Sequence, residues 1–187
     1  MRAFLYGSTF VLMLLLLTAC GDQSVSNYIE DTDSYELKDV ITSSADSSDY
    51  SKVYQVNGKS IEQVSDELKN WREPEEESDV VDGRKLMIYG EELVVLSEED
   101  GEAQVEVSED DFVRDNYSPS FFNQLMTLAI INRFLGIDGW GTVQRDRCRA
   151  GDCYGGYTSS GGSYRGPSGP SPFKGYSSRG GGPGVGK

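Results

Sequence analysis

The composition of the chain changes at Ala150, and this change limits how much of it can fold into a compact domain. Residues 151–187 contain 13 of the 22 glycines, together with serine, proline, four tyrosines and scattered arginine and lysine. A segment of this kind cannot bury enough apolar surface to offset the entropy lost when it becomes ordered. We therefore predict a disordered Gly-rich tail over residues 154–187, with the folded domain before it.

The N-terminus has the three parts of a secretory signal. Arg2 and the amino group form a positive start, residues 10–17 are apolar, and a Leu-Thr-Ala sequence leads to Cys20. This layout is typical of a signal peptide, and its ending on Leu-x-Ala-Cys is typical of a bacterial lipobox. We expect a signal peptide over residues 1–19 and a lipid on the thiol of Cys20, which anchors the protein to the cell membrane.

A transmembrane helix and a plain secretory signal are the alternatives for this segment. The apolar run is shorter than the ~20 residues that a membrane span needs, and a plain signal does not need the cysteine. Residues 20–27 then form a short polar tether that reaches at most ~25 Å when extended. We expect a domain over residues 28–137 to lie close to the membrane.

Charge is distributed unevenly between the two parts of the chain. Residues 144–187 hold seven basic and two acidic residues, a net charge of +5. Because the whole chain carries a net charge of −14, residues 1–143 carry −19. An acidic body argues against nucleic-acid binding, which needs clustered Lys and Arg on the folded surface. The basic tail is better suited to anionic envelope polymers or lipid head groups, where each basic residue contributes ~1 kcal/mol.

The chain has no histidine and three cysteines. The absence of histidine excludes histidine-ligated zinc and Ser-His-Asp or Cys-His nucleophiles. The acidic runs near residues 31–33 and 98–102 do not have the spacing of a calcium loop. The C-terminal GGPGVGK lacks the strand, the following Ser or Thr and the helix of a phosphate-binding loop. We expect no catalytic residue, no metal and no cofactor.

Cys148 and Cys153 are the two cysteines outside the lipobox. A close pair in an exported protein favours a disulfide, here closing a connector over residues 138–153. The alternative is a redox pair, because the flanking Arg147 and Arg149 would lower a thiol pKa. Four intervening residues are not the spacing of thiol oxidoreductases, however.

Strand-like patterns dominate the predicted domain. Five segments alternate between apolar and polar residues or form short apolar runs bounded by turn residues. They are residues 35–42, 52–56, 85–89, 92–96 and 103–107. The last of these alternates strictly, which predicts that one of its faces is solvated. The pattern predicts an α+β fold, with a small antiparallel sheet packed against one or two helices.

Two helices are predicted beside these strands. Ser60 and Gln63 form a capping box at the start of the first, which has an apolar stripe and stops at Pro74. The stripe consists of Ile61, Val64, Leu68 and Trp71. The second begins at Pro119, runs to residue 135 and is apolar on more than one face. It is expected in the core, with contact to a partner or a membrane surface as the alternative.

Several segments together resemble a known family. They are the lipobox, a Ser/Asp loop before KVYQV, FVRDNYSPSFF at residues 112–122, the two cysteines with CYGG, and RGGGPGVGK at residues 179–187. They are similar to bacterial lipoproteins with domain of unknown function 4247, found mainly in Bacillus-type bacteria. The resemblance implies a Gram-positive lipoprotein on the outer face of the cytoplasmic membrane. It implies no activity, substrate or catalytic residue.

The FVRDNYSPSFF segment links the predicted sheet to the second helix. Arg114 and Asp115 are candidates for a pair that fixes this junction, and Tyr117 and Phe121 for its packing. A structural hinge and a binding site are both open for it. We expect the whole protein to act as a non-enzymatic interaction or scaffold protein for unidentified envelope proteins. The alternatives are thiol-redox chemistry at the two C-terminal cysteines, or a ligand-binding lipoprotein.

Overall fold

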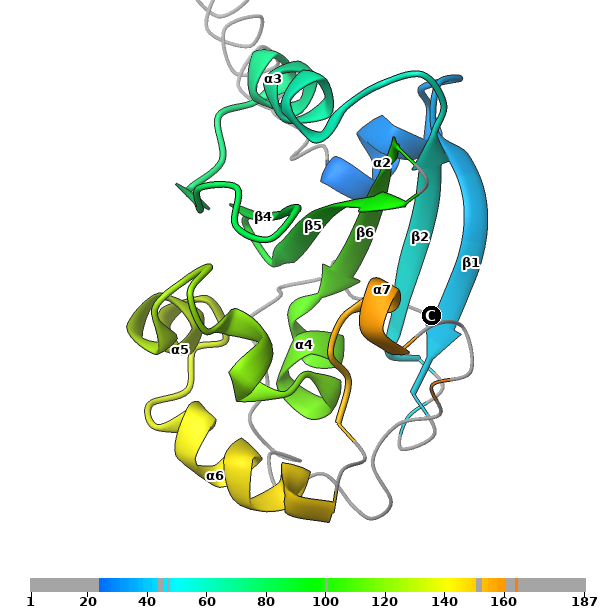
Figure 1. Ribbon diagram of the computed structural model, residues 1–187. Helices are drawn as coiled ribbons and strands as arrows, with labels where there is room; N and C mark the ends of the chain where they lie inside the picture. Colours follow the sequence, from blue (N-terminus) through cyan, green and yellow to red (C-terminus); the bar gives the residue numbers. More distant parts are fainter. Residues whose placement is uncertain are drawn as a thin grey trace, which may run out of the picture.

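A six-stranded antiparallel sheet forms the centre of the molecule (Figure 1). The structure, a computed structural model, describes residues 24–43, 46, 48–99, 101–150, 153–160 and 164. The strand order is β1-β2-β6-β5-β4-β3, and the strands are β1 (Glu36–Thr42), β2 (Tyr50–Val56), β3 (Glu76–Glu77), β4 (Arg84–Tyr89), β5 (Glu92–Glu99) and β6 (Glu102–Glu109). The predicted α+β class is confirmed, and all five predicted strands overlap observed ones.

Helices contribute to a core on each face of this sheet (Figure 1). On one face lie α2 (Val25–Glu30) and α3 (Ile61–Trp71). The other core takes its residues from α4 (Asp110–Asn116), the 3₁₀ turn η2 (Pro119–Phe122), α5 (Leu128–Phe134), α6 (Trp140–Arg147) and the segment before α7 (Tyr157–Ser160). A further 3₁₀ turn, η3 (Cys148–Ala150), follows α6. No helix within the described ranges is long and apolar enough to cross a membrane.

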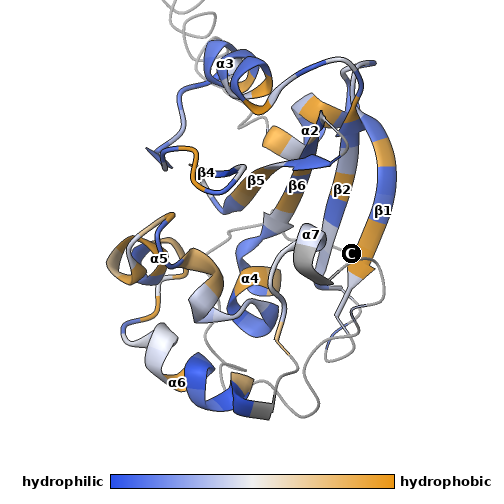
Figure 2. Cartoon of the chain, in the orientation of Figure 1, coloured by the Kyte–Doolittle hydropathy of each residue, from blue (hydrophilic) through white to orange (hydrophobic). Residues whose placement is uncertain are grey.

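Helix α3 forms as its local sequence predicts. The Ser60 hydroxyl accepts from the Gln63 amide at 3.4 Å, and the Gln63 side chain accepts from the Ser60 amide at 2.9 Å. These two bonds satisfy backbone donors that a helix start leaves unpaired. Its apolar positions lie on the side of the helix that faces the sheet (Figure 2). Ile61, Val64 and Leu68 are buried there.

Strand β6 corrects the prediction of a solvated face. Every residue from Ala103 to Ser108 is buried. Ala103, Val105 and Val107 pack under α2 and α3, as the alternation predicts. The polar residues between them face the core on the opposite side of the sheet, here called the second core, to which α4, α5 and α6 contribute. They do not face water, because that side of the sheet is also covered. The covering elements lie far away in sequence, so the strand's own pattern carries no sign of them.

The predicted second helix is interrupted. Pro119–Phe122 forms η2, and the α-helical part begins only at Leu128 as α5. Gln124 has a φ of 72°, a left-handed conformation that no α-helix contains. The break lets both Phe121 and Phe122 enter the core beside Tyr117. The segment is therefore mainly part of the core, although not as one helix.

The folded domain is longer than predicted at its N-terminal end. Val25, which falls in the predicted tether over residues 20–27, begins α2 and is fully buried. The Ser24 hydroxyl caps this helix, and the carboxylate of Glu92 accepts from the Val25 amide at 2.7 Å. A helix of six residues is too short to show a clear period. Residues 1–19 and Cys20 lie outside the described residues.

The C-terminal boundary is also later than predicted. Tyr154, placed at the start of the disordered tail, is fully buried, and residues 157–160 form α7. The predicted connector over residues 138–153 contains α6, which packs on the domain. Beyond residue 160 the predicted tail lies outside the described residues, apart from Tyr164. That side chain contacts the ring of Tyr154 with 4.8 Å between centroids.

Candidate functional site

A buried carboxylate, that of Glu106, lies at the middle of β6. It is 3% exposed. One of its oxygens accepts from the hydroxyls of Ser51 and Tyr117, each at 2.9 Å, and the other accepts from the Tyr157 amide at 3.0 Å. Burial raises the pKa of Glu106, and these donors partly offset the rise by stabilising the ionised form.

Three segments meet at this carboxylate. Ser51 belongs to β2, Tyr117 follows α4, and Tyr157 begins α7. The hydroxyl of Ser108 donates to that of Ser51 at 2.8 Å and extends the network along the same strand pair. A buried charge is tolerated only when it is hydrogen-bonded. Glu106 therefore holds these segments in one arrangement, and its burial separates it from solvent.

Aromatic rings surround the ring of Tyr117. Its ring meets those of Tyr154 and Phe121 edge-on, each with 5.0 Å between centroids, and Phe112 contacts both tyrosines. Burial and the nearby carboxylate raise the pKa of Tyr117 well above its ordinary value. The hydroxyl therefore stays protonated and acts as a donor. Tyr117 and Phe121, the two residues predicted to pack at the junction, both lie in this buried cluster.

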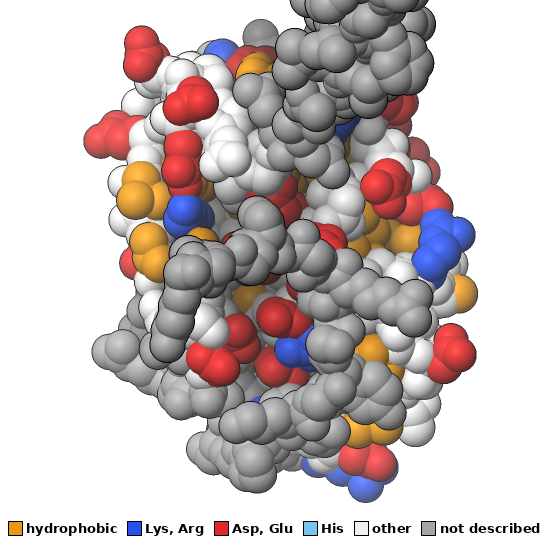
Figure 3. Space-filling model, turned by 180° about the vertical axis from the view of Figure 1, so that it is seen from behind, with side chains coloured by type: hydrophobic (Ala, Val, Ile, Leu, Met, Phe, Trp, Pro, Cys, Tyr) orange, Lys and Arg blue, Asp and Glu red, His pale blue; other side chains and the backbone are white. Residues whose placement is uncertain are grey.

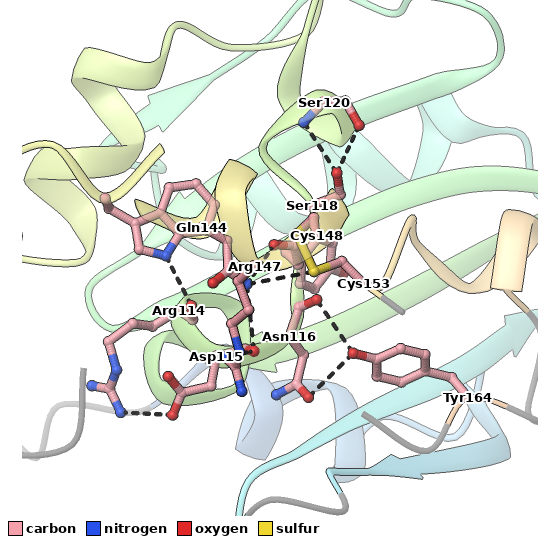
Figure 4. The surroundings of a disulfide bond; sticks show 12 residues. Arg114, Asp115, Asn116, Ser118, Ser120, Gln144, Arg147, Cys148, Cys153 and Tyr164 are labelled. Carbon is pink, nitrogen blue, oxygen red and sulfur yellow. Dashed lines mark hydrogen bonds and ion pairs between the residues drawn. A yellow bond between two sulfur atoms is a disulfide. The ribbon is translucent and has the colours of Figure 1, made fainter. Parts of the chain in front are cut away.

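Helix α6 binds the last turn of α4 through three side chains (Figure 4). Trp140 donates from its indole nitrogen to the Arg114 carbonyl at 2.8 Å. Gln144 donates to the Tyr117 carbonyl at 3.0 Å, and Arg147 donates to the Asp115 carbonyl at 2.7 Å. Carbonyls at the end of a helix lack partners within it, so these donors complete the end of α4.

The predicted Arg114–Asp115 pair is present but does not span the junction. Arg114 contacts the Asp115 carboxylate at 3.5 Å and also pairs with Asp111 one turn earlier. Both contacts stay within α4. The junction is fixed instead by the backbone carbonyls of residues 114 and 115, which accept from α6.

Burial and nearby carboxylates raise the pKa of Asp49, in the β1–β2 connection, to about 6, and Arg114 partly offsets this.

A disulfide joins Cys148 and Cys153 beside this junction (Figure 4). Directly after it, the Tyr154 amide donates to the Asn116 carbonyl and the Ser118 amide donates to the Tyr154 carbonyl, both at 2.8 Å. These bonds form a short parallel bridge beside Tyr117. Both cysteines are half-buried. The bridge therefore lies next to the backbone contacts that hold Tyr154 against the core.

Comparison with known protein families decides the classification of the chain. A family model described as domain of unknown function (DUF4247) matches residues 13–187. The chain belongs to the DUF4247 family. No curated protein and no solved structure is significantly similar to it. In this DUF4247 protein, the FVRDNYSPSFF segment forms η2 and most of α4, and a disulfide joins the two C-terminal cysteines.

Three residues of the DUF4247 site are not indicated by any sequence pattern described above. Glu106, Trp140 and Gln144 are buried and hydrogen-bonded there. The only signal for Glu106 was its polar position in an alternating strand, which normally indicates a solvated face. Within the residues that the structure describes, no group of three His, Cys, Asp or Glu side chains could hold a metal ion.

Proposed function

We propose that this DUF4247 protein is a lipoprotein on the outer face of the cytoplasmic membrane of a Gram-positive bacterium. There it acts as a non-enzymatic interaction or scaffold protein. The observation that carries the proposal is the short distance along the chain between Cys20 and the first packed residues. Ser24 already caps α2, and Val25 is fully buried.

This spacing gives a lipid on Cys20 a mechanical consequence. The four residues from Cys20 to Ser24 span at most ~14 Å when fully extended. Helix α2 does not swing freely, because Glu92 accepts from the amides of Val25 and Ser26 at 2.7 and 3.3 Å. The end of the domain that carries α2 is thus held at the membrane surface, and the rest of the sheet projects away from it.

The folded surface and the tail suit different partners. Seen from behind, acidic side chains are spread over the described surface (Figure 3), in keeping with the excess of Asp and Glu over Lys and Arg in the sequence. A surface of this charge is repelled by anionic lipid and wall polymers. The tail beyond Tyr164 has four basic residues and no Asp or Glu. We assign contacts with those anionic polymers or lipid head groups to the tail, and contacts with envelope proteins to the domain.

Metabolic labelling with a palmitate analogue tests the anchor. The wild-type chain is expected to incorporate the label and to sediment with membranes, whereas Cys20→Ser loses both properties. A double Cys148→Ser, Cys153→Ser variant is the control, because it removes two cysteines and leaves the lipobox intact. Label on the Cys20→Ser variant, or its absence from the wild type, would contradict the proposal.

Crosslinking in intact cells tests the interaction role. Anchored wild-type protein is expected to give a reproducible set of envelope partners that the Cys20→Ser variant loses. A truncation after Tyr164 removes the basic tail without touching the described core. It should weaken binding of unlipidated protein to anionic liposomes and leave the protein crosslinks in place. Unchanged liposome binding would refute the task assigned to the tail.

A further inference from the structure

Strand β1 forms an open edge of the sheet (Figure 1). It pairs only with β2, so within the described residues no strand lies along its other side. The Val40 amide donates to the Asp39 carboxylate at 2.8 Å and not to β2, so this amide faces the open edge. An edge of seven residues is long enough for another extended chain to pair with it.

Two apolar side chains are exposed on this edge strand. Leu37 is 54% exposed and Val40 is 45% exposed. Leu37 lies opposite Tyr54, which belongs to the core under α2 and α3. Val40 lies opposite Lys52, which pairs with Glu30 of α2. Because residues directly opposite each other share a face of the sheet, both apolar side chains lie on the face that carries α2.

A register shift puts these two residues on one face although they are three positions apart. Residues three apart in a regular strand point to opposite faces. The pairing of β1 with β2 skips Lys38, as in a β-bulge. Lys38 and Asp39 then both lie toward the second core. The Lys38 ammonium lies 5.6 Å from the centroid of the Tyr157 ring, and Asp39 lies opposite the buried Val53.

The edge is complementary to a second copy of itself. Antiparallel pairing about a two-fold axis between residues 38 and 39 puts Leu37 opposite Val40 of the second copy on the α2 face. It puts Lys38 opposite Asp39 of the second copy on the other face. The symmetry repeats each contact, which gives two apolar pairs and two pairs of opposite charge. Cross-strand pairs of both kinds stabilise a sheet.

The register shift makes this pairing selective for the same chain. Bulges and charges on an edge strand usually prevent pairing with other strands. Two copies of β1 carry the extra residue at the same place, so their registers stay matched on both sides of the axis. A regular strand would slip by one residue beyond Lys38, which turns its side chains to the wrong face.

We propose that β1 is an interface between two copies of this protein, whose sheets join edge to edge through antiparallel β1 strands. An interface built from one short strand per copy is at the low end of the ~1,200–2,000 Å² found in stable complexes, so the dimer is weak in solution. The proposal does not rest on lipidation, because every residue in it belongs to the folded domain.

Oxidative crosslinking of cysteine variants tests the register. Full-length chains with Cys20→Ser, in non-ionic detergent, carry either Leu37→Cys or Val40→Cys. Directly opposite residues have Cα atoms ~4.5–5.5 Å apart, within reach of a disulfide, whereas identical positions in the two copies lie ~10 Å apart along the strands. A mixture of the two variants should therefore crosslink at least about fivefold faster than either variant alone.

Val80→Cys is the matched control, because Val80 is 43% exposed and lies outside β1. Its mixture with Leu37→Cys should crosslink no faster than Leu37→Cys alone. An equal rate for this control and for the mixture of Leu37→Cys with Val40→Cys would mean random collision and would overturn the proposal. Absence of a crosslink in the latter mixture would overturn it as well.

Charge reversal tests the pairs on the other face, by sedimentation velocity of the full-length chain in the same detergent. Lys38→Glu puts like charges opposite Asp39 twice and should raise the dissociation constant of the dimer at least about fivefold. Lys69→Glu is the control, because Lys69 is also a surface lysine in one ion pair and its reversal changes the net charge equally. It should leave the dissociation constant unchanged.

Two results of the sedimentation experiment contradict the dimer. Equal weakening by Lys38→Glu and Lys69→Glu would mean general repulsion between acidic chains and no specific pairing. A wild-type chain that stays monomeric up to about 1 mM, the dissociation constant of a very weak complex, would show that β1 does not pair with itself.

Discussion

The hydroxyl of Tyr117 donates to the buried carboxylate of Glu106 over 2.9 Å. This contact joins the segment after α4 to the central strand β6. The same carboxylate also accepts from the Ser51 hydroxyl and from the Tyr157 amide. It therefore connects β2 and the start of α7 to the segment after α4. The sheet alone would not hold the C-terminal segment in place.

Tyr117→Phe is therefore expected to destabilise the protein. The variant keeps the ring and removes one donor from a buried carboxylate, which should lower the free energy of unfolding by about 1–3 kcal/mol. Denaturant unfolding measures this change. Tyr28→Phe is the control, because the ring of Tyr28 stacks on Trp71 near the surface, and it should alter stability by less than about 0.5 kcal/mol. Equal effects of the two variants would refute the role given to Glu106.

Gly156→Ala is expected to be more destabilising than Gly58→Ala. Both glycines have positive φ, 84° and 72°, but a Cβ at residue 156 would lie 2.7 Å from a ring carbon of Phe121, whereas residue 58 has open space. The conformational cost is about 1 kcal/mol at either position, and the clash should add about 1–2 kcal/mol at Gly156. Thermal or denaturant unfolding of the two variants provides the comparison. Similar losses would show that residue 156 is not packed on Phe121 in solution.

Reduction of the Cys148–Cys153 disulfide is expected to loosen the C-terminal segment and spare the sheet. Opening so short a loop should cost about 2 kcal/mol of stability. Hydrogen exchange should accelerate at Tyr154 and Tyr157 and stay slow in β5 and β6, because the sheet does not depend on the bridge.

The same experiment bears on the redox alternative. A structural bridge resists mild reductants, whereas a catalytic pair is reduced and reoxidised readily. Intact mass after alkylation, with and without a mild reductant, distinguishes the two outcomes. Rapid cycling without any change in exchange at Tyr154 would favour thiol-redox chemistry over the structural task.

Stability is expected to depend on pH through Asp49. Its pKa is raised to about 6 in the folded state, largely by burial, and is about 3.9 in an unfolded chain. Between these values the folded state binds more protons than the unfolded state, so this contribution to stability is present below pH 4 and is lost as pH rises through 6.

Asp49→Asn should remove this loss. The variant is expected to gain about 1–2 kcal/mol over wild type at pH 7.5 relative to pH 4. Denaturant unfolding at both pH values measures the difference. The exposed Asp79→Asn is the control, and its curve should run parallel to that of the wild type. A parallel curve for Asp49→Asn would refute the environment described for this carboxyl.

Local signals explain what could be predicted of the fold. The capping box of Ser60 and Gln63 lies within four residues, and the strands show their alternation within five to eight residues. Patterns that span so few residues predict the same helix or strand in any fold that buries its apolar side. The short helix α2 has only its Ser24 cap as a local signal, and its amides also depend on Glu92, 67 residues away from Val25.

The candidate site was predicted only in part for the same reason. The sequence singled out Arg114, Asp115, Tyr117 and Phe121 through one segment, and all four lie at the junction. Their partners come from distant positions, since Trp140 reaches a carbonyl 26 residues away and the Tyr157 amide reaches a carboxylate 51 residues away. No local pattern records such contacts.

By itself the sequence determined the α+β class, the start and stop of α3, the positions of the main strands and the family. Each of these depends on backbone capping or on the burial of one apolar face, which act between near neighbours in the chain. Only the tertiary structure decided that the polar face of β6 is buried, that Tyr154 belongs to the core, and that Leu37 and Val40 of β1 stay exposed. These features depend on which separate segments cover each strand, and coverage is a property of the folded chain as a whole.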